Sequence, residues 1–341
     1  MRAMVVKNWG EAFVLEERPD PQPAPGEAVM KIHAAGVGLT LVTMRTGIFG
    51  GTAPRVMGHE LGGEITAVGD GVENIKIGQR CAVYFYLNCG YCRWCRNGRE
   101  TLCEHHGGYF GVHRDGGYAD FVCLPSENFI PIPDNLDYEG AAIAADAVNT
   151  PWHCMRERAQ INPHDDVMLV GAGGGVGIHG VQVAKLFGAR VIAVDISEEK
   201  LELAKRWGAD EVVNFMAIED LALEAKRLTD GKGVDAAIAF VGKSETFQAC
   251  IDGLSVGGRA VVIGAQPGDV KVNPVNLVIT EQTVTGSRHS TRAELIETMD
   301  IMARGLVEPV VGKRKHFTEV EELFEDLNKE KLLGRGALTY D

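Results

Sequence analysis

The feature that most restricts the fold is a glycine-rich turn between a predicted strand, Asp166–Val170, and a predicted helix, Ile178–Phe187. Glycine in such a turn lets the backbone approach a pyrophosphate at the helix N-terminus, where unpaired N–H groups favour an anion. The spacing departs from a plain G-x-G-x-x-G, since the nearest match begins at Ala172. The turn nevertheless predicts a dinucleotide site on a parallel sheet. Its residues are Gly171, Ala172, Gly173, Gly174, Gly175, Val176 and Gly177.

An acidic residue follows at the distance that such a site requires. The next predicted strand, Arg190–Val194, ends in Asp195, which lies 18 residues beyond Gly177. A carboxylate at this point accepts hydrogen bonds from the adenosine ribose and repels the 2′-phosphate of NADP. The sequence therefore predicts NAD(H) as the cofactor, in preference to NADP(H).

The succession of predicted strands and helices along the sequence divides the chain into three parts. Residues 1–150 contain short alternating runs punctuated by glycine and proline, a pattern typical of β structure with long loops. Residues 151–290 alternate strands with helices and predict a doubly wound parallel sheet, followed by a β-rich segment at Val270–Val278. Residues 291–341 carry helices at Arg292–Arg304 and Val320–Lys331 and a strand at Gly336–Thr339, and we expect them to return to the first domain.

Charge and hydropathy exclude several partners. Acidic residues outnumber basic ones 47 to 34, and no basic run interrupts the net charge of −13, so we expect no nucleic-acid partner. The longest apolar runs fall well short of the roughly 18 residues of a membrane helix. Met1–Val6 leads directly into strand-like sequence, which predicts a cytoplasmic protein without a cleaved targeting segment.

Four of the eight cysteines crowd into residues 89–103. Cys89, Cys92, Cys95 and Cys103 offer a complete thiolate set for a closed tetrahedral zinc, which is typical of a structural metal. Disulfides and an iron–sulfur cluster are the alternatives for this spacing. The absence of any secretion signal and of other electron-transfer features favours structural zinc.

Together with Gly58-His59-Glu60 and Gly116-Gly117-Tyr118-Ala119, these motifs closely resemble the medium-chain, zinc-type alcohol dehydrogenases over nearly the whole chain. The resemblance implies an α/β protein with a GroES-like catalytic domain (1–150), a Rossmann domain (151–290) and a C-terminal return (291–341). It also implies contacts of Lys200 with the ribose and of Arg335 with the pyrophosphate, and a nicotinamide-facing Thr150. Ile263 is assigned to the same cofactor site.

The catalytic metal site departs from the family pattern. The family binds zinc through a cysteine, the histidine of Gly-His-Glu, and a cysteine or aspartate before the second domain. Here the cysteine position is Gly38 and the supporting aspartate is Leu41. His59 and Asp146 remain as ligands, with Glu60 as a further candidate, and Thr40 matches the hydroxyl that relays the alcohol proton. We expect a catalytic zinc that is absent or readily lost.

These features predict an NAD(H)-dependent oxidoreductase that transfers hydride between nicotinamide and a secondary alcohol or ketone. Without zinc, Thr40 or His59 would hydrogen-bond the substrate oxygen directly. This favours a substrate whose reaction needs less stabilisation of the charge that develops on that oxygen. The alternatives are therefore a zinc-independent enone or quinone reductase, and an alicyclic hydroxyacyl-CoA dehydrogenase suggested by Asp146–Pro151. A non-enzymatic cofactor-binding scaffold is a third class. Relatives pair their nucleotide domains, which predicts a homodimer or homotetramer.

Overall fold

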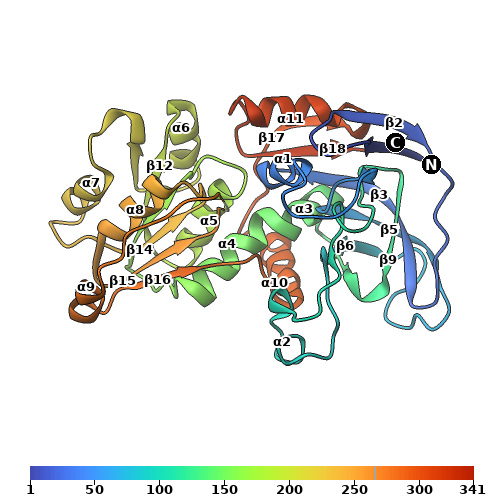
Figure 1. Ribbon diagram of the computed structural model, residues 1–341, viewed down its shortest axis with the longest axis horizontal. Coiled ribbons are helices and arrows are strands. Elements are labelled where there is room, and N and C mark those ends of the chain that lie inside the picture. The colour runs from blue at the N-terminus through green and yellow to red at the C-terminus, as the bar shows by residue number, and fades with distance from the viewer. Residues whose placement is uncertain (265) are drawn as a thin grey trace. The chain divides into compact units, whose positions relative to one another are not determined.

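The computed structural model describes residues 1–264 and 266–341. The chain divides into two compact units (Figure 1). The first unit comprises Met1–Asn149 together with Thr291–Asp341, and the second comprises Thr150–Ser290. No helix in the described residues is long and apolar enough to cross a membrane.

A seven-stranded sheet forms the centre of the first unit, in the order β10-β6-β5-β3-β18-β17, with β9 also paired to β3. The long strand β3 alternates buried Met30 and Ile32 with half-buried Lys31 and His33, as a strand with one face on the core should. These strands are β3 (Glu27–Val37), β5 (Leu61–Val68), β6 (Arg80–Val83), β9 (Phe121–Pro125), β10 (Phe129–Pro131), β17 (Val311–His316) and β18 (Arg335–Thr339).

Strand β18 brings the last part of the sequence beside β3. The two strands are antiparallel, with Gly336 opposite Val37 and Ala337 opposite Gly36. This register sets Arg335, the first residue of β18, at the level of Gly38, which follows β3. Residues almost 300 positions apart in the sequence thus meet at one point of the sheet.

Two smaller sheets and several short helices complete the first unit. The small sheets have the orders β2-β1-β4 and β7-β8. Their strands are β1 (Arg2–Val6), β2 (Phe13–Glu17), β4 (Arg55–Val56), β7 (Tyr86–Leu87) and β8 (Gly108–Tyr109). The helices are α1 (Leu39–Arg45), α2 (Arg93–Arg96), η1 (Glu100–Leu102), η2 (Ser126–Asn128), α3 (Tyr138–Ile143), the π-helical η3 (Ala144–Val148), α10 (Arg292–Ala303), η6 (Phe317–Glu319) and α11 (Val320–Asn328).

The second unit is built on a six-stranded parallel sheet in the order β13-β12-β11-β14-β15-β16. The chain order reverses between β11 and β14, and this switch point is where such sheets bind ligands. The strands are β11 (Asp166–Val170), β12 (Arg190–Asp195), β13 (Glu211–Asn214), β14 (Val234–Ala239), β15 (Leu254–Val262) and β16 (Thr283–Gly286). The topology confirms the predicted α/β class with a doubly wound sheet.

The helices between residues 149 and 290 are α4 (Asn149–His153), η4 (Cys154–Arg158), α5 (Gly177–Leu186), α6 (Glu198–Arg206), η5 (Phe215–Ala217), α7 (Leu221–Leu228), α8 (Ser244–Asp252) and α9 (Pro274–Thr280). Buried aliphatic residues of β11, β12 and β14, among them Met168, Ile192 and Ala237, pack with α8 residues such as Phe247 into the core of this unit. A core of this kind holds the ends of the strands, and therefore the loops that follow them, in fixed positions.

The predicted β-rich segment Val270–Val278 is wrong, because the structure forms helix α9 at Pro274–Thr280. The Asn273 side chain accepts a hydrogen bond from the backbone N–H of Val275, and Pro274 occupies the first turn, where its missing N–H costs nothing. Helix-start chemistry thus outweighs the β preference of the valines in this segment.

Candidate functional site

The glycine turn leads from β11 into α5 at the switch point of the parallel sheet. A Cβ at Gly177 would lie 2.8 Å from Cα of Ala172, so a larger residue could not bring the helix this close to the strand. No side chain caps the N-terminus of α5. The N–H of Ile178 donates to the Gly174 carbonyl, and a helix N-terminus without a side-chain cap is the kind of site at which proteins bind a pyrophosphate.

Asp195 binds the same turn. One carboxylate oxygen accepts a hydrogen bond from the Gly173 N–H at 2.9 Å, and the other accepts from the Ile196 N–H at 2.9 Å. Since each carboxylate oxygen can accept more than one hydrogen bond, the residue retains capacity for a ligand hydroxyl. The carboxylate thus shapes the turn, and its contact with the adenosine ribose stays a prediction.

Two other predicted cofactor residues lie near the carboxyl ends of these strands. A Cβ at Gly173 would lie 2.9 Å from Cα of Lys200 on α6, so that helix packs against the turn. Ile263 follows β15 and donates its backbone N–H to the Ala239 carbonyl at the end of β14. Thr150 lies in α4 of the same unit and is buried.

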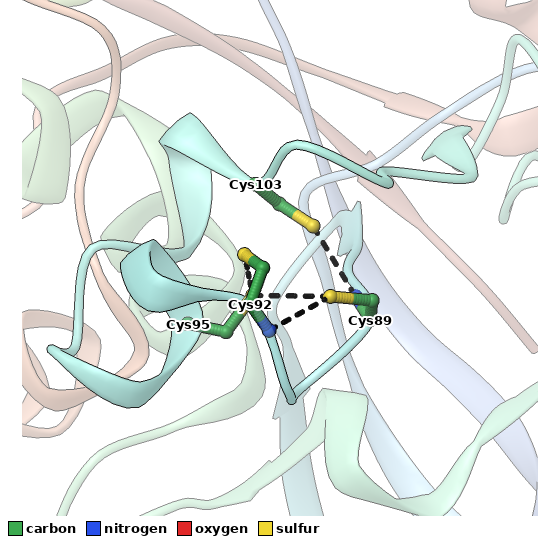
Figure 2. A group of neighbouring side chains, drawn as sticks. All are labelled: Cys89, Cys92, Cys95 and Cys103. Carbon is green, nitrogen blue, oxygen red and sulfur yellow. Dashed lines mark hydrogen bonds between the residues drawn. The ribbon is translucent and has the colours of Figure 1, made fainter.

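The four cysteines of residues 89–103 converge on one point, as Figure 2 shows. All four sulfurs lie within 4.8 Å of one another, with 3.5 Å between Cys92 and Cys95 and 3.9 Å between Cys89 and Cys95. Zinc with Zn–S bonds of about 2.3 Å places its sulfur ligands about 3.8 Å apart. The spacing of these thiols therefore fits one tetrahedral zinc ion.

Backbone and side-chain donors surround this lobe. The N–H groups of Cys89 and Cys92 point at the sulfurs of Cys103 and Cys89, each at 3.4 Å. Hydrogen bonds from the backbone, that of Cys95 foremost, hold the pKa of the Cys92 thiol below its usual range. Such donors favour thiolates, which are the form that ligates zinc.

A residue outside the lobe supports one of its sulfurs. The Asn88 amide lies 3.8 Å from Sγ of Cys95, and the Asn88 carbonyl oxygen accepts a hydrogen bond of 2.9 Å from Arg292 on α10. Sequence reasoning missed Arg292 and Asn88, because nothing in the spacing of the cysteines indicates which helix the lobe rests on.

His59, Glu60 and Asp146 come together in the first unit, as the sequence predicts for a catalytic centre. His59 and Glu60 precede β5, while Asp146 lies in the π-helical segment η3, a distortion often found at functional sites. Neither ring nitrogen of the buried His59 has a hydrogen-bond partner among the described residues. The imidazole packs on the ring of Phe85, with 4.2 Å between the two ring centroids. Thr40, at the start of α1, is exposed, and within residues 1–264 and 266–341 it makes no hydrogen bond to this group.

Arg335 completes this buried group. Its Nε donates to Oε2 of Glu60 at 3.0 Å, its Nη2 donates to Oε1 of Glu60, and Nη2 also donates to Oδ2 of Asp146 at 2.8 Å. The Arg335 side chain is only 2% exposed. The pyrophosphate contact implied for Arg335 stays a prediction, since its hydrogen bonds here go to the two carboxylates.

The electrostatic environment keeps the Arg335 side chain positively charged. Burial opposes the positive charge, but the attraction of Glu60 and Asp146 outweighs it and raises the pKa of the Arg335 guanidinium. For Glu60, burial is the largest influence and raises the pKa of the carboxyl group, while Arg335 opposes that shift. The guanidinium is therefore a permanent cation between two carboxyl groups.

The same residues fit a catalytic metal poorly. Nε2 of His59 lies 4.0 Å from Oε1 of Glu60 and 3.9 Å from Oδ2 of Asp146. Four-coordinate zinc with nitrogen and oxygen ligands at about 2.1 Å places neighbouring ligand atoms about 3.4 Å apart. These two separations are moderately wider than that, and the stronger obstacle is that both oxygens already bind Nη2 of Arg335.

The sequence held one indication of a basic partner such as Arg335: the family's zinc-binding cysteine is replaced by Gly38, while the carboxylates of Glu60 and Asp146 are retained. Two buried carboxylates need a positive partner, and if a metal does not supply it, a basic side chain must. Sequence reasoning did not find that partner, because Arg335 lies 275 residues beyond Glu60 and only the pairing of β18 with β3 brings it there.

Comparison with known families matches both units. Residues 24–134 match the alcohol dehydrogenase GroES-like domain, and residues 175–304 match the zinc-binding dehydrogenase domain. The chain is 34% identical to an NAD-dependent alcohol dehydrogenase of Sulfurisphaera tokodaii, covering 99% of each protein. It is 30% identical to an acryloyl-coenzyme A reductase of Metallosphaera sedula, over 99% of this chain and 100% of that one. A crystal structure of an NAD-dependent alcohol dehydrogenase superposes with a TM-score of 0.93 at 33% identity, covering 100% of both chains.

Proposed function

The chain belongs to the medium-chain, zinc-type alcohol dehydrogenase family, and on this premise we propose that it is an NAD(H)-dependent oxidoreductase acting on a secondary alcohol or ketone. The observation that carries this proposal is the buried His59, whose two ring nitrogens have no partner among the described residues. A buried polar group without a partner is costly, so it points to a ligand that completes its hydrogen bonds.

His59 is the proposed catalytic residue. When bound, NAD(H) supplies or accepts the hydride. In the reducing direction the carbonyl carbon gains the hydride with its electron pair, and the oxygen gains a proton through the His59 imidazole. In the oxidising direction the imidazole takes that proton back. Thr40, matching the family's proton-relay hydroxyl, is a second candidate for contact with the oxygen.

The cofactor site proposed is the turn Gly171–Gly177 with Asp195, Lys200 and Ile263, and with Thr150 toward the nicotinamide. Support comes from the uncapped N-terminus of α5 and from the close approach of backbone that Gly177 permits. We further propose one structural zinc on Cys89, Cys92, Cys95 and Cys103, whose sulfur spacing fits a tetrahedral ion. No catalytic zinc is proposed.

Asp195 should set the choice between NAD(H) and NADP(H). We expect Asp195→Ser combined with Ile196→Arg to reduce the preference for NADH over NADPH, judged by kcat/KM, by about 10- to 100-fold, since a charge repelling the 2′-phosphate is replaced by one that attracts it. Steady-state kinetics with both coenzymes tests this. Asp210→Ser, which alters a carboxylate that precedes β13 and pairs with Lys185 on α5, serves as the control. Equal efficiency of the parent protein with both coenzymes would contradict the assignment.

A second candidate function is reduction of a carbon–carbon double bond conjugated to a carbonyl, as in an enoyl thioester. Arg335 favours it, because the guanidinium binds both carboxylate oxygens that a catalytic zinc would need. Addition of hydride to such an alkene spreads the charge into an enolate, which requires less stabilisation than an alkoxide. The relative named acryloyl-coenzyme A reductase supports this candidate as well.

A coenzyme-oxidation assay separates these functions. Purified protein with NADH is offered secondary ketones, conjugated enones and enoyl-CoA thioesters, and the products are identified by mass spectrometry. Alcohol products from ketones support the first proposal, and saturated carbonyl products support the second. His59→Ala should lower either activity by about 100-fold or more if the imidazole donates the proton. Tight NADH binding without turnover of any substrate would indicate a non-enzymatic scaffold.

We also propose a homo-oligomer formed through the second unit. Strand β16 lies at the edge of the six-stranded sheet, and α9 exposes Val275, Val278 and Ile279 at 62–79%. An open edge beside exposed aliphatic residues suits pairing with a second copy. Light scattering should give at least twice the chain mass of 36.8 kDa, whereas a monomer at all concentrations would refute the proposal. The cytoplasmic location expected from the sequence remains a prediction.

A further inference from the structure

Gly36 and Gly38 have no side chains, and this leaves space for the buried group formed by Arg335, Glu60 and Asp146. A Cβ at Gly38 would lie no more than 2.5 Å from Nη1, Cζ and Nη2 of Arg335. A Cβ at Gly36 would lie 2.7 Å from Cδ of Glu60 and nearer still to one of its oxygens. These atoms are the ends of side chains that are held by their hydrogen bonds to one another. A side chain at position 38 would therefore displace the guanidinium of Arg335 and break its hydrogen bonds to the two carboxylates.

The guanidinium also holds the atoms that a metal would need. The oxygens nearest to Nε2 of His59 are Oε1 of Glu60 and Oδ2 of Asp146, at 4.0 and 3.9 Å. Both accept hydrogen bonds from a single atom, Nη2 of Arg335. A metal ion bound to these oxygens and to His59 would have to lie beside this permanent cation, with which it would compete for the same electron pairs.

We infer that the guanidinium of Arg335 is the resident cation of this site in place of a metal ion, and that Gly38 is the residue that makes room for it. The inference rests on the proposed function only in locating the reaction beside His59. Gly38 is then part of a rebuilt site, and not simply a lost ligand. Arg335 acts as a positioning residue, since it holds both carboxylates and leaves His59 to meet the substrate oxygen.

The inference predicts which substitutions restore a second metal. Gly38→Cys alone should leave zinc at one ion per chain, bound by the four-cysteine lobe, because the new side chain overlaps Arg335. Gly38→Cys combined with Arg335→Met should raise zinc to two per chain, since the introduced thiol, His59 and Asp146 then form a three-ligand set with an open position. Gly38→Ser with Arg335→Met is the matched control, which fills the same space without a thiolate and should stay at one.

Metal content after incubation with excess zinc and desalting is measured by mass spectrometry, so the readout is independent of turnover. Replacement by Co²⁺ provides a second readout, because a thiolate on cobalt absorbs in the near ultraviolet and the double variant should gain this absorption relative to its serine control. A second zinc bound by Gly38→Cys alone as firmly as by the double variant would overturn the inference.

The unmodified protein keeps the test decisive even if the double variant does not fold. With excess zinc it should retain one ion per chain after desalting, and the ¹⁵N resonances of the His59 ring, assigned by comparison with His59→Ala, should not move. Two retained zinc ions, or a metal-dependent shift of the His59 resonances, would refute the inference. Failure to find a substrate would contradict the proposed function and leave these metal measurements unaffected.

Discussion

Replacing Arg335 with leucine is expected to lower the free energy of unfolding by about 3–5 kcal/mol, the usual cost of removing one partner of a buried ion pair. The reason is that Glu60 and Asp146 would lose the guanidinium that both bind inside the first unit, where their side chains are 0% and 10% exposed. Urea unfolding followed by tryptophan fluorescence measures the change.

Arg314 provides a matched control on the neighbouring strand β17. Its guanidinium makes the same two-bond contact with Glu139, at 2.7 and 2.8 Å, but its side chain is 55% exposed. Arg314→Leu should therefore cost no more than about 1 kcal/mol. If Arg335→Leu costs no more than Arg314→Leu, the buried group does not stabilise the fold in the way described.

A double-mutant cycle locates the origin of the loss. Glu60→Gln removes one of the uncompensated charges, so adding it to Arg335→Leu should recover part of the lost stability, although the same change in the parent protein destabilises it. The double variant should be more stable than the sum of the single changes predicts. Additive effects would mean that Arg335 stabilises the protein through packing and not through its charge.

Replacing Cys95 with serine is expected to reduce zinc from one ion per chain to nearly none and to unfold residues 89–103 locally. Two short helices, α2 and η1, are the helical structure of this lobe, so zinc on the proposed four-cysteine site would supply most of its folding free energy, as in small zinc domains. Metal analysis together with limited proteolysis of the lobe measures the change. The melting temperature should fall, whereas the rate of the chemical step at low temperature should change less.

Cys123→Ser is the control for this substitution. Cys123 lies in β9, outside the lobe, where its thiol contacts Glu27. Its replacement should leave the zinc content and the proteolysis pattern of the lobe unchanged. Freshly purified parent protein that contains no zinc and has four free thiols in the lobe would contradict the assignment.

Local patterns of the sequence predicted the features that depend on neighbouring residues. The turn at Gly171–Gly177 could be identified because the strand, the glycines and the helix are contiguous, and the parallel sheet follows from the repetition of that unit. The cysteine lobe was equally accessible, since its four ligands lie within 15 residues. Helix α9 was missed because β-branched composition was weighed above the capping by Asn273 and the proline beside it.

The environment of the group formed by His59, Glu60 and Asp146 could be predicted only in part. These three residues were identified by resemblance, and the weak or absent metal expected from Gly38 stays a prediction. The identity of the cation could not be deduced, because it depends on the register between β3 and β18. Such long-range pairings are set by the packing of the whole sheet, and no local pattern encodes them.

The pairing of β18 with β3 also determines the order in which the two units can be completed during synthesis. Arg335 is added to the growing chain 275 residues after Glu60, which at about 5–20 residues per second is a delay of roughly 14–55 s. The second unit, Thr150–Ser290, is complete before that moment. Until β18 leaves the ribosome, Glu60 lacks the guanidinium that it binds in the folded protein. The second unit can therefore fold before the first unit has all the strands of its seven-stranded sheet.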